Sequence, residues 1–157
     1  MNLFNIFKKK IKPVDSEYVF DKAKYHDNSI EQLGLDEEQA FVHTGLFFAW
    51  LVNNGLMSNF FCDETGDGII ELKDRKISPS TLYMSWDGVL SGEMLSEKGY
   101  NFALNYFDFK KGAYLTNYEY VFNVKDGQVF TVRDTWDNYD KIKPLIDEAY
   151  KEWCSKF

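Results

Sequence analysis

The stretch DEEQAFVHTGLFFAWLVNNG, residues 36–55, decides the fold of this chain. Asp36 can cap a helix, with Gln39 in the capping-box position three residues later, and Gly55 is typical of a helix end. From Ala40 to Val52, apolar residues fall on every face, which predicts a helix buried nearly all round. The run is too short to cross a bilayer, which needs about 20 residues. We therefore expect this helix to form the centre of the core.

Shorter elements are predicted before and after the central helix. Gly45 would let another element approach the helix backbone closely. The residue pattern predicts short helices over 17–26, 68–77 and 80–85 and a helix over 96–107, with a loop over 27–35 and a turn at Asp87-Gly88.

The last third of the sequence predicts a β-hairpin and then a long helix. Residues 118–124 and 128–133 favour strands and flank the turn sequence of residues 125–127. Thr135 can cap a helix to about Trp153, and Pro144 predicts a kink or a division there. An apolar stripe at helical spacing comprises Tyr139, Ile142, Ile146, Ala149 and Trp153. The expected fold class is α+β, mainly α-helical, with a buried central helix, surrounding helices and one small antiparallel β-hairpin.

Length and charge limit the organisation and the partners. The 157 residues favour one domain at 15–157, preceded by a basic arm at 1–14. Apart from the four lysines of the arm (Lys8, Lys9, Lys10 and Lys12), the chain has 14 basic and 25 acidic side chains, a net charge of −11. Nucleic-acid binding needs a cationic face, so we expect none. The apolar start of the arm is too short for stable membrane anchoring.

Few residues offer catalytic or cofactor chemistry. The two cysteines, Cys62 and Cys154, are far apart and predict reduced thiols in a cytoplasmic protein. Phosphate-loop, dinucleotide-binding and serine-hydrolase motifs are absent from the sequence. His26 and His43 are the only histidines, and neither has the spacing of a metal site. We expect His43 to be a core imidazole. We predict no cofactor, no metal and no enzymatic activity, while a small enzyme using either histidine remains a further alternative.

One local pattern indicates calcium. Counted from Asp63, residues 63–74 resemble an EF-hand loop, with oxygen-bearing side chains at positions 1, 3, 5 and 9 and glycine at position 6. Asp74 at the last position is shorter than the usual glutamate. The other interpretation is an acidic turn in which Gly66 and Gly68 have positive φ.

Two clusters combine tryptophan with carboxylates at predicted element ends. Such clusters are good anchors for a basic partner, although core tryptophans with capping aspartates give the same pattern. The predicted partner-binding residues are Trp86, Asp87, Glu93, Asp134, Trp136 and Asp137.

The sequence resembles a bacterial domain family of unknown function. The resemblance rests on FDKAKYH at 20–26, EQAFVHTGLF at 38–47 and RDTWDNY at 133–139, with shorter matches at 50–51, 54–56, 146–147 and 150–153. It covers roughly residues 18–154. Small proteins of this kind resemble the immunity proteins of polymorphic toxin systems. The resemblance implies an immunity protein that neutralises a cognate toxin. Because the domain is acidic and bears aromatic candidate residues, we expect a toxin whose active-site cleft is basic. The alternative is a calcium-responsive binding module using residues 63–74.

Overall fold

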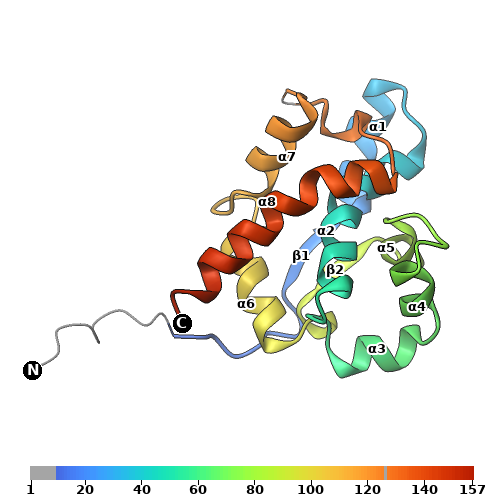
Figure 1. Cartoon of the computed structure of the whole chain (residues 1–157). Helices are drawn as coiled ribbons and strands as arrows, with labels where there is room; N and C mark the ends of the chain where they lie inside the picture. Colours follow the sequence, from blue (N-terminus) through green and yellow to red (C-terminus); the bar gives the residue numbers. More distant parts are fainter. Residues whose placement is uncertain (1–9, 126) are drawn as a thin grey trace, which may run out of the picture.

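Helix α2 (Val42–Asn53) lies at the centre of the fold, with α6, α7 and α8 on one side and α3, α4 and α5 on the other (Figure 1). The computed structural model describes residues 10–125 and 127–157, so most of the predicted arm at 1–14 lies outside the described residues. The other elements are β1 (Val19–Lys22), the 3₁₀ helix η2 (Ala23–His26), α1 (Asp27–Leu33), η3 (Glu37–Phe41), α3 (Asn59–Thr65), α4 (Gly68–Lys73), α5 (Thr81–Ser85), β2 (Val89–Ser91), η4 (Gly92–Met94), α6 (Glu97–Tyr106), α7 (Tyr114–Phe122), η5 (Val129–Thr131) and α8 (Trp136–Cys154).

The central helix is buried as its composition predicts. Every residue from Val42 to Val52 is buried. The ring of Phe47 stacks on that of Phe107 with centroids 4.7 Å apart, and the indole of Trp50 donates a hydrogen bond to Asp147 Oδ1 at 2.8 Å. Full burial of one such ring contributes about 1.5–3 kcal/mol, so α2 provides a large share of the core.

The start of the central helix differs from the expected capping box, whereas its end is as predicted. Asp36 precedes η3 and its side chain caps nothing, while the Gln39 amide donates instead to the carbonyls of Phe130 and Val132. The predicted glycine end is confirmed, because Gly55 has φ +67°. Gly45 also permits the expected close approach: a Cβ built there would lie 2.9 Å from the Ser80 Cα.

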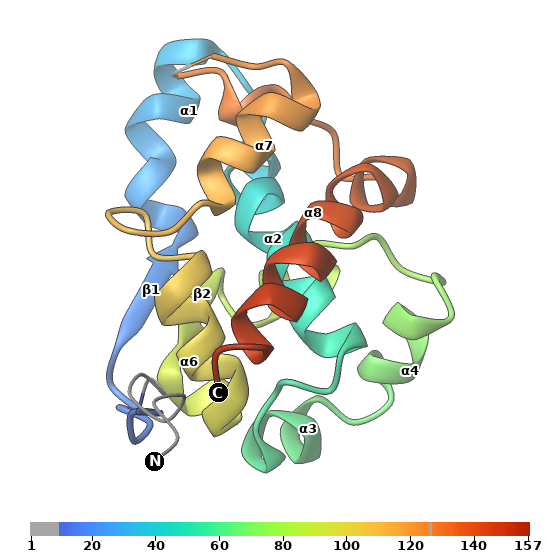
Figure 2. The ribbon, with the colours of Figure 1, turned by 60° about the vertical axis from the view of Figure 1, so that its left-hand side comes forward.

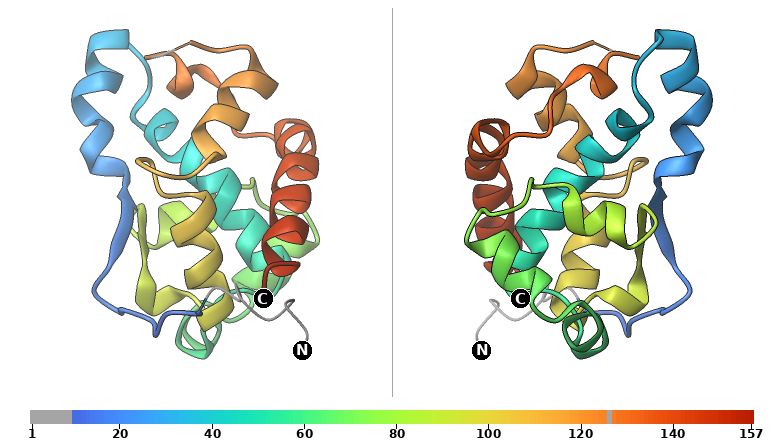
Figure 3. Two further views of the ribbon diagram at one scale, coloured as in Figure 1. Left: turned by 90° about the vertical axis from the view of Figure 1, so that its left-hand side faces the viewer. Right: turned by 90° about the vertical axis from the view of Figure 1, so that its right-hand side faces the viewer.

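The N-terminal segment corrects two predictions. Residues 17–26 form β1 and η2 rather than one helix, and α1 occupies most of the predicted loop at 27–35. β1 pairs antiparallel with β2, and that pairing supplies backbone hydrogen-bond partners that a local sequence pattern does not reveal. Figures 2 and 3 show α1 and α7 at one end of the molecule and α3 at the other.

The predicted β-hairpin is wrong, although the fold class is correct. Residues 114–122 form α7 and residues 129–131 form η5, so the two-stranded antiparallel sheet consists of β1 and β2. The rings of Tyr114, Tyr118 and Phe122 follow one another at four-residue spacing along α7, with centroids 5.9 and 4.7 Å apart. Burial of this helical stripe outweighs the strand preference of the individual residues.

The remaining predicted elements are largely confirmed. Helices α4, α5 and α6 lie within the predicted ranges, and Asp87 and Gly88 both have positive φ. Thr135 caps α8 by accepting a hydrogen bond from the Asn138 N–H at 3.2 Å. α8 continues as a single helix across Pro144. Within the described residues, no helix is long and apolar enough to cross a membrane.

Candidate functional site

A buried carboxylate lies where β1 meets the start of α2. The pairing register shifts between Val19 and Asp21, so that both Phe20 and Asp21 are buried although they are adjacent in the strand. Such bulges redirect side chains. The next turn is fixed in place because the Ala23 N–H donates to the Gly88 carbonyl at 2.8 Å. The Asp21 side chain is 1% exposed.

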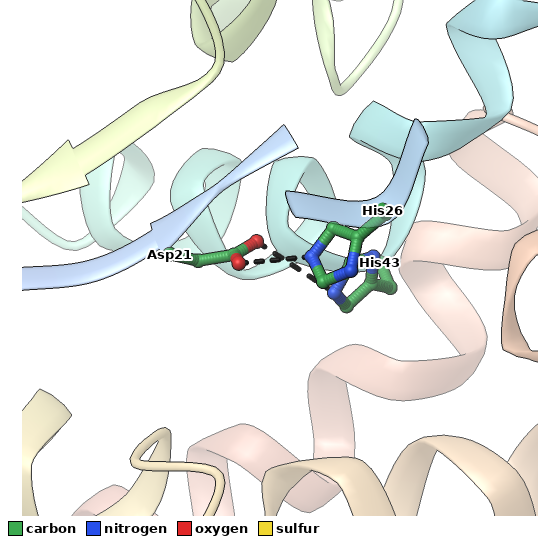
Figure 4. A group of neighbouring side chains, drawn as sticks. All are labelled: Asp21, His26 and His43. Atoms are coloured by element: carbon green, nitrogen blue, oxygen red, sulfur yellow. Dashed lines mark hydrogen bonds and ion pairs between the residues drawn. The ribbon is translucent and has the colours of Figure 1, made fainter. Parts of the chain in front are cut away.

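Both histidines of the chain face Asp21 (Figure 4). His26, at the end of η2, has Nε2 2.9 Å from Asp21 Oδ1 and is 19% exposed. His43, in the first turn of α2, has Nε2 3.7 Å from Asp21 Oδ2 and is 2% exposed. The two imidazole rings meet edge to face with centroids 4.9 Å apart, and the Phe130 ring packs against both. We call Asp21, His26 and His43 the Asp–His cluster.

Hydroxyl groups complete the environment of the cluster. Thr44 Oγ1 and the Tyr83 hydroxyl donate to Asp21 Oδ2, at 2.6 and 3.3 Å. Burial raises the pKa of the Asp21 carboxyl, but the hydrogen bonds from His26 and Thr44, with attraction to an imidazole when it is protonated, outweigh burial and leave the pKa below its usual value. Burial lowers the pKa of His43 to about 4, so its imidazole is neutral near pH 7. The cluster therefore holds a carboxylate beside a neutral imidazole.

Sequence reasoning identified the histidines but missed Asp21. The expected core position of His43 is confirmed, although His43 Nδ1 has no hydrogen-bond partner among the described protein atoms. The sequence predicts a helix over residues 17–26, and that prediction gives no reason to expect burial of Asp21. Both histidines are packed against Asp21, an arrangement that does not favour the alternative of a small enzyme with a histidine in an open pocket.

The predicted partner residues Trp86 and Asp87 lie between two acidic grooves. The first, which we call the α3–α5 groove, has a volume of about 540 Å³ and is lined by Glu64, Thr65, Gly68, Glu71, Ile77, Thr81, Leu82, Ser85 and Trp86. Trp86 packs on Phe61 at 5.0 Å between centroids and donates its indole N–H to Thr65 Oγ1. Between Asn59 and Leu72 the chain has four carboxylates and no lysine or arginine. The groove thus combines an aromatic wall with acidic rims.

The second groove lies on the other side of the turn at Asp87. This α1 groove has a volume of about 570 Å³ and is lined by Ala23, Lys24, Asp27, Ile30, Glu31, Leu35, Glu37, Phe41 and Asp87. Four carboxylates and one lysine surround an apolar floor. The neighbouring residues Trp86 and Asp87 therefore contribute to two different grooves, each acidic and partly apolar.

The other predicted partner residues are placed differently. Asp134 accepts hydrogen bonds from Ser78 Oγ and the Ser80 N–H, which ties it to the segment before α5. Trp136 donates to the carbonyl of Ile77, a residue of the α3–α5 groove, and its ring is covered by the Arg75 guanidinium at 4.7 Å. Asp137 and Glu93 are exposed, on α8 and η4. Trp136 is thus beside the first groove, and Asp134 has a structural role.

Residues 63–74 do not form an EF-hand loop. Residues 63–65 belong to the last turn of α3 and residues 68–73 form α4, so only a short turn separates two helices. A calcium loop needs about 12 residues wrapped around the ion. The acidic-turn interpretation fits better, with φ +56° at Gly66, whereas Gly68 does not have the positive φ expected of it. Cys62 and Cys154 are free thiols, as expected.

Residues 19–132 match the family described as a domain of unknown function (DUF7832). The chain belongs to this family. The match extends from β1 to just beyond η5, so the DUF7832 region contains the Asp–His cluster and both grooves. The predicted resemblance also included residues 133–154, which lie beyond the DUF7832 match. No curated protein and no solved structure matches the chain.

Proposed function

We propose that this DUF7832 protein binds and neutralises a basic toxin domain through the acidic surface around Trp86 and Asp87. The observation that carries this proposal is the pair of acidic grooves that meet at this turn. The resemblance to immunity proteins supplies the kind of partner, a toxin domain, and the acidity of the grooves favours a toxin whose active-site cleft is basic. The proposed location is the cytoplasm, in keeping with the two free thiols.

The chemistry of the grooves suits lysine or arginine side chains. A guanidinium or ammonium group entering the α3–α5 groove would contact the indole of Trp86 and the carboxylates of Glu64 and Glu71. Cation–π contact and charge pairing both favour such a group. Phe60, 48% exposed, packs against Trp86 and extends the aromatic surface. Exposed aromatic anchors of this kind commonly dominate binding energy.

Electrostatics would act mainly on the rate of association. A net charge of −7 and two acidic grooves would steer a basic partner towards this face. Asp137 is the better probe of the predicted α8 contacts, because Asp134→Lys would also break the hydrogen bonds to residues 78 and 80. Asp137→Lys should slow association, and unchanged affinity would remove this end of α8 from the proposed interface.

The test begins with capture of the partner by the purified full-length protein from a lysate of its source organism, followed by mass spectrometry. The supporting result is a stoichiometric toxin domain whose activity falls as the complex forms. Association rates are then measured for two charge-reversal variants, Glu64→Lys/Glu71→Lys and Glu31→Lys/Glu37→Lys. Glu148→Lys/Glu152→Lys is the matched control, since these exposed glutamates lie on α8 and line neither groove.

Reversal in at least one groove should slow association by about tenfold or more, while the control should change it far less. Equal effects of all three variants would show that net charge alone matters and would contradict the grooves as the interface. Failure to capture any toxin domain, or capture without loss of its activity, would contradict the proposed function.

A further inference from the structure

The Asp–His cluster brings together every histidine of the chain. Two residues of 157 are histidine, and they come from different elements, η2 and α2. One ligand atom from each of Asp21, His26 and His43 can be chosen so that all three lie within 4.8 Å of one another. Among the described residues this is the one such group of histidine, cysteine and carboxylate side chains.

We propose that Asp21, His26 and His43 bind a divalent transition-metal ion of the zinc class. Two imidazole nitrogens and one carboxylate oxygen suit zinc and its neighbours, whereas calcium and magnesium prefer oxygen ligands alone. Three protein ligands leave a further coordination position for water or another ligand. His26, the most exposed of the three, provides contact with solvent.

The three side chains lie close enough for such an ion to draw them together. Ligands held tetrahedrally at about 2.0–2.1 Å from zinc lie about 3.3 Å from one another. Asp21 Oδ1 lies 2.9 Å from His26 Nε2, and the other carboxylate oxygen, Oδ2, lies 3.7 Å from His43 Nε2, so each imidazole is near this spacing from one oxygen of Asp21. One ligand atom from each residue lies within 4.8 Å of the other two, so an ion at a common centre would draw the side chains together by up to about 1.5 Å.

The surroundings also resemble those of a built site. Thr44 and Tyr83 both donate hydrogen bonds to Asp21 Oδ2 and so fix the orientation of the carboxylate. Hydrogen bonds of this kind hold metal ligands in place. The ring of His43 is held by packing against Phe109, Tyr118 and Phe130. The ion pairs of Asp21 within the described residues are with imidazoles alone, so a cation at the centre would compensate a buried negative charge.

The experiment uses the full-length, untagged protein, stripped with a chelator and dialysed against zinc ions alone. Bound metal is measured per chain for the wild type, for His26→Ala and for Cys62→Ser/Cys154→Ser. The cysteine variant is the matched control, because thiolates are the other strong zinc ligands in the chain. His26→Ala is preferred to a change at His43, since His26 is partly exposed and its removal disturbs the core less.

We expect one zinc ion per chain in the wild type and in the cysteine variant. His26→Ala should weaken zinc binding by at least about 100-fold, since loss of a residue that only supports a ligand already costs 10–100-fold. No zinc in the wild type, loss of zinc in the cysteine variant, or undiminished binding by His26→Ala would each overturn the proposal. If His26→Ala fails to fold, the absorption spectrum of the cobalt-substituted wild type decides. Visible d–d bands show that cobalt is bound, and a thiolate charge-transfer band in the near ultraviolet contradicts the proposed ligands, whereas bound cobalt without that band supports them.

Discussion

The first turn of helix α2 and its following part, up to Val52, are both buried, yet they are built from different chemistry. From Leu46 to Val52 the helix is wholly apolar, whereas its first turn contains His43 and Thr44. The apolar part needs only close neighbours of the right volume. The polar turn needs particular partners, because a buried polar group without a hydrogen bond destabilises the fold. The burial of α2 as a whole therefore follows from its apolar composition. The burial of its polar first turn depends on hydrogen bonding to Asp21, which belongs to another element.

The largest effect is expected from a cavity in the apolar part. Phe47→Ala should lower the free energy of unfolding by about 3–5 kcal/mol, because the ring is fully buried. Urea denaturation measures the change. Phe60→Ala removes the same ring from a position that is 48% exposed and should cost less than half as much. Similar decreases in the free energy of unfolding of both variants would show that the core is not centred on α2.

The polar turn predicts a pH dependence of stability in the metal-free protein. The pKa of His43 is about 4 in the fold and 6.5 ordinarily, so between these values the unfolded chain binds a proton that the folded chain does not. The free energy of unfolding should therefore decrease by about 3 kcal/mol as the pH falls from 6.5 to 4, and this contribution should be constant above 6.5.

Denaturation midpoints in a chelating buffer at several pH values test this prediction, with His43→Gln as the control. The variant should lose most of the dependence between pH 4 and 6.5. The lowered pKa of Asp21 acts mainly below pH 4, where protonation of the carboxyl removes its stabilising contribution. An equally steep pH dependence in His43→Gln would contradict the assignment to His43.

A smaller effect is expected where α2 meets the segment before α5. In Gly45→Ala the added Cβ would lie 2.5 Å from the Ser80 Cβ and 2.9 Å from its Cα, so the backbone of one element must move. Overpacking of this kind costs about 1–3 kcal/mol. Thermal denaturation should show a lower midpoint. A midpoint equal to that of the wild type would mean that this contact is looser than the structure indicates.

The smallest effect is expected at the C-terminal end of the same helix. In Gly55→Ala the new methyl group meets no atom within 4 Å, so only the positive φ of +67° opposes the change. A left-handed conformation costs a non-glycine residue about 1 kcal/mol. The two glycine variants, measured side by side by thermal denaturation, separate a steric cost from a conformational one. A larger decrease of the midpoint in Gly55→Ala than in Gly45→Ala would contradict the expectation that the steric cost is the greater one.

The accuracy of the sequence predictions followed the range of the interactions. The stripe of α8 and the Thr135 cap depend on residues within one or two turns and were predicted correctly. The strand β1 pairs with β2, some 70 residues away along the chain, and was predicted as helix. α7 was predicted as strand because its side chains individually favour strands. The sequence nevertheless contains the helical pattern, since aromatic residues recur there every four positions.

For the candidate sites, the sequence supplied residue types and the structure supplied their neighbours. Trp86 and Asp87 were predicted as partner-binding residues from their chemistry, which stays a prediction, but only the fold shows two grooves meeting there. Asp134 was chosen by the same reasoning and proves to be hydrogen-bonded to residues 78 and 80.

By itself, the sequence determined that a buried helix lies within residues 40–52, that the chain is mainly helical and that its net charge is negative. These properties follow from local periodicity and composition, which belong to the sequence and do not depend on how the chain folds. Only the tertiary structure decided that residues 21, 26 and 43 meet. That meeting requires a bulge in β1, a turn held by Gly88 and the docking of α2 beside them. No single segment contains that information, because burial and hydrogen bonding between distant residues determine it.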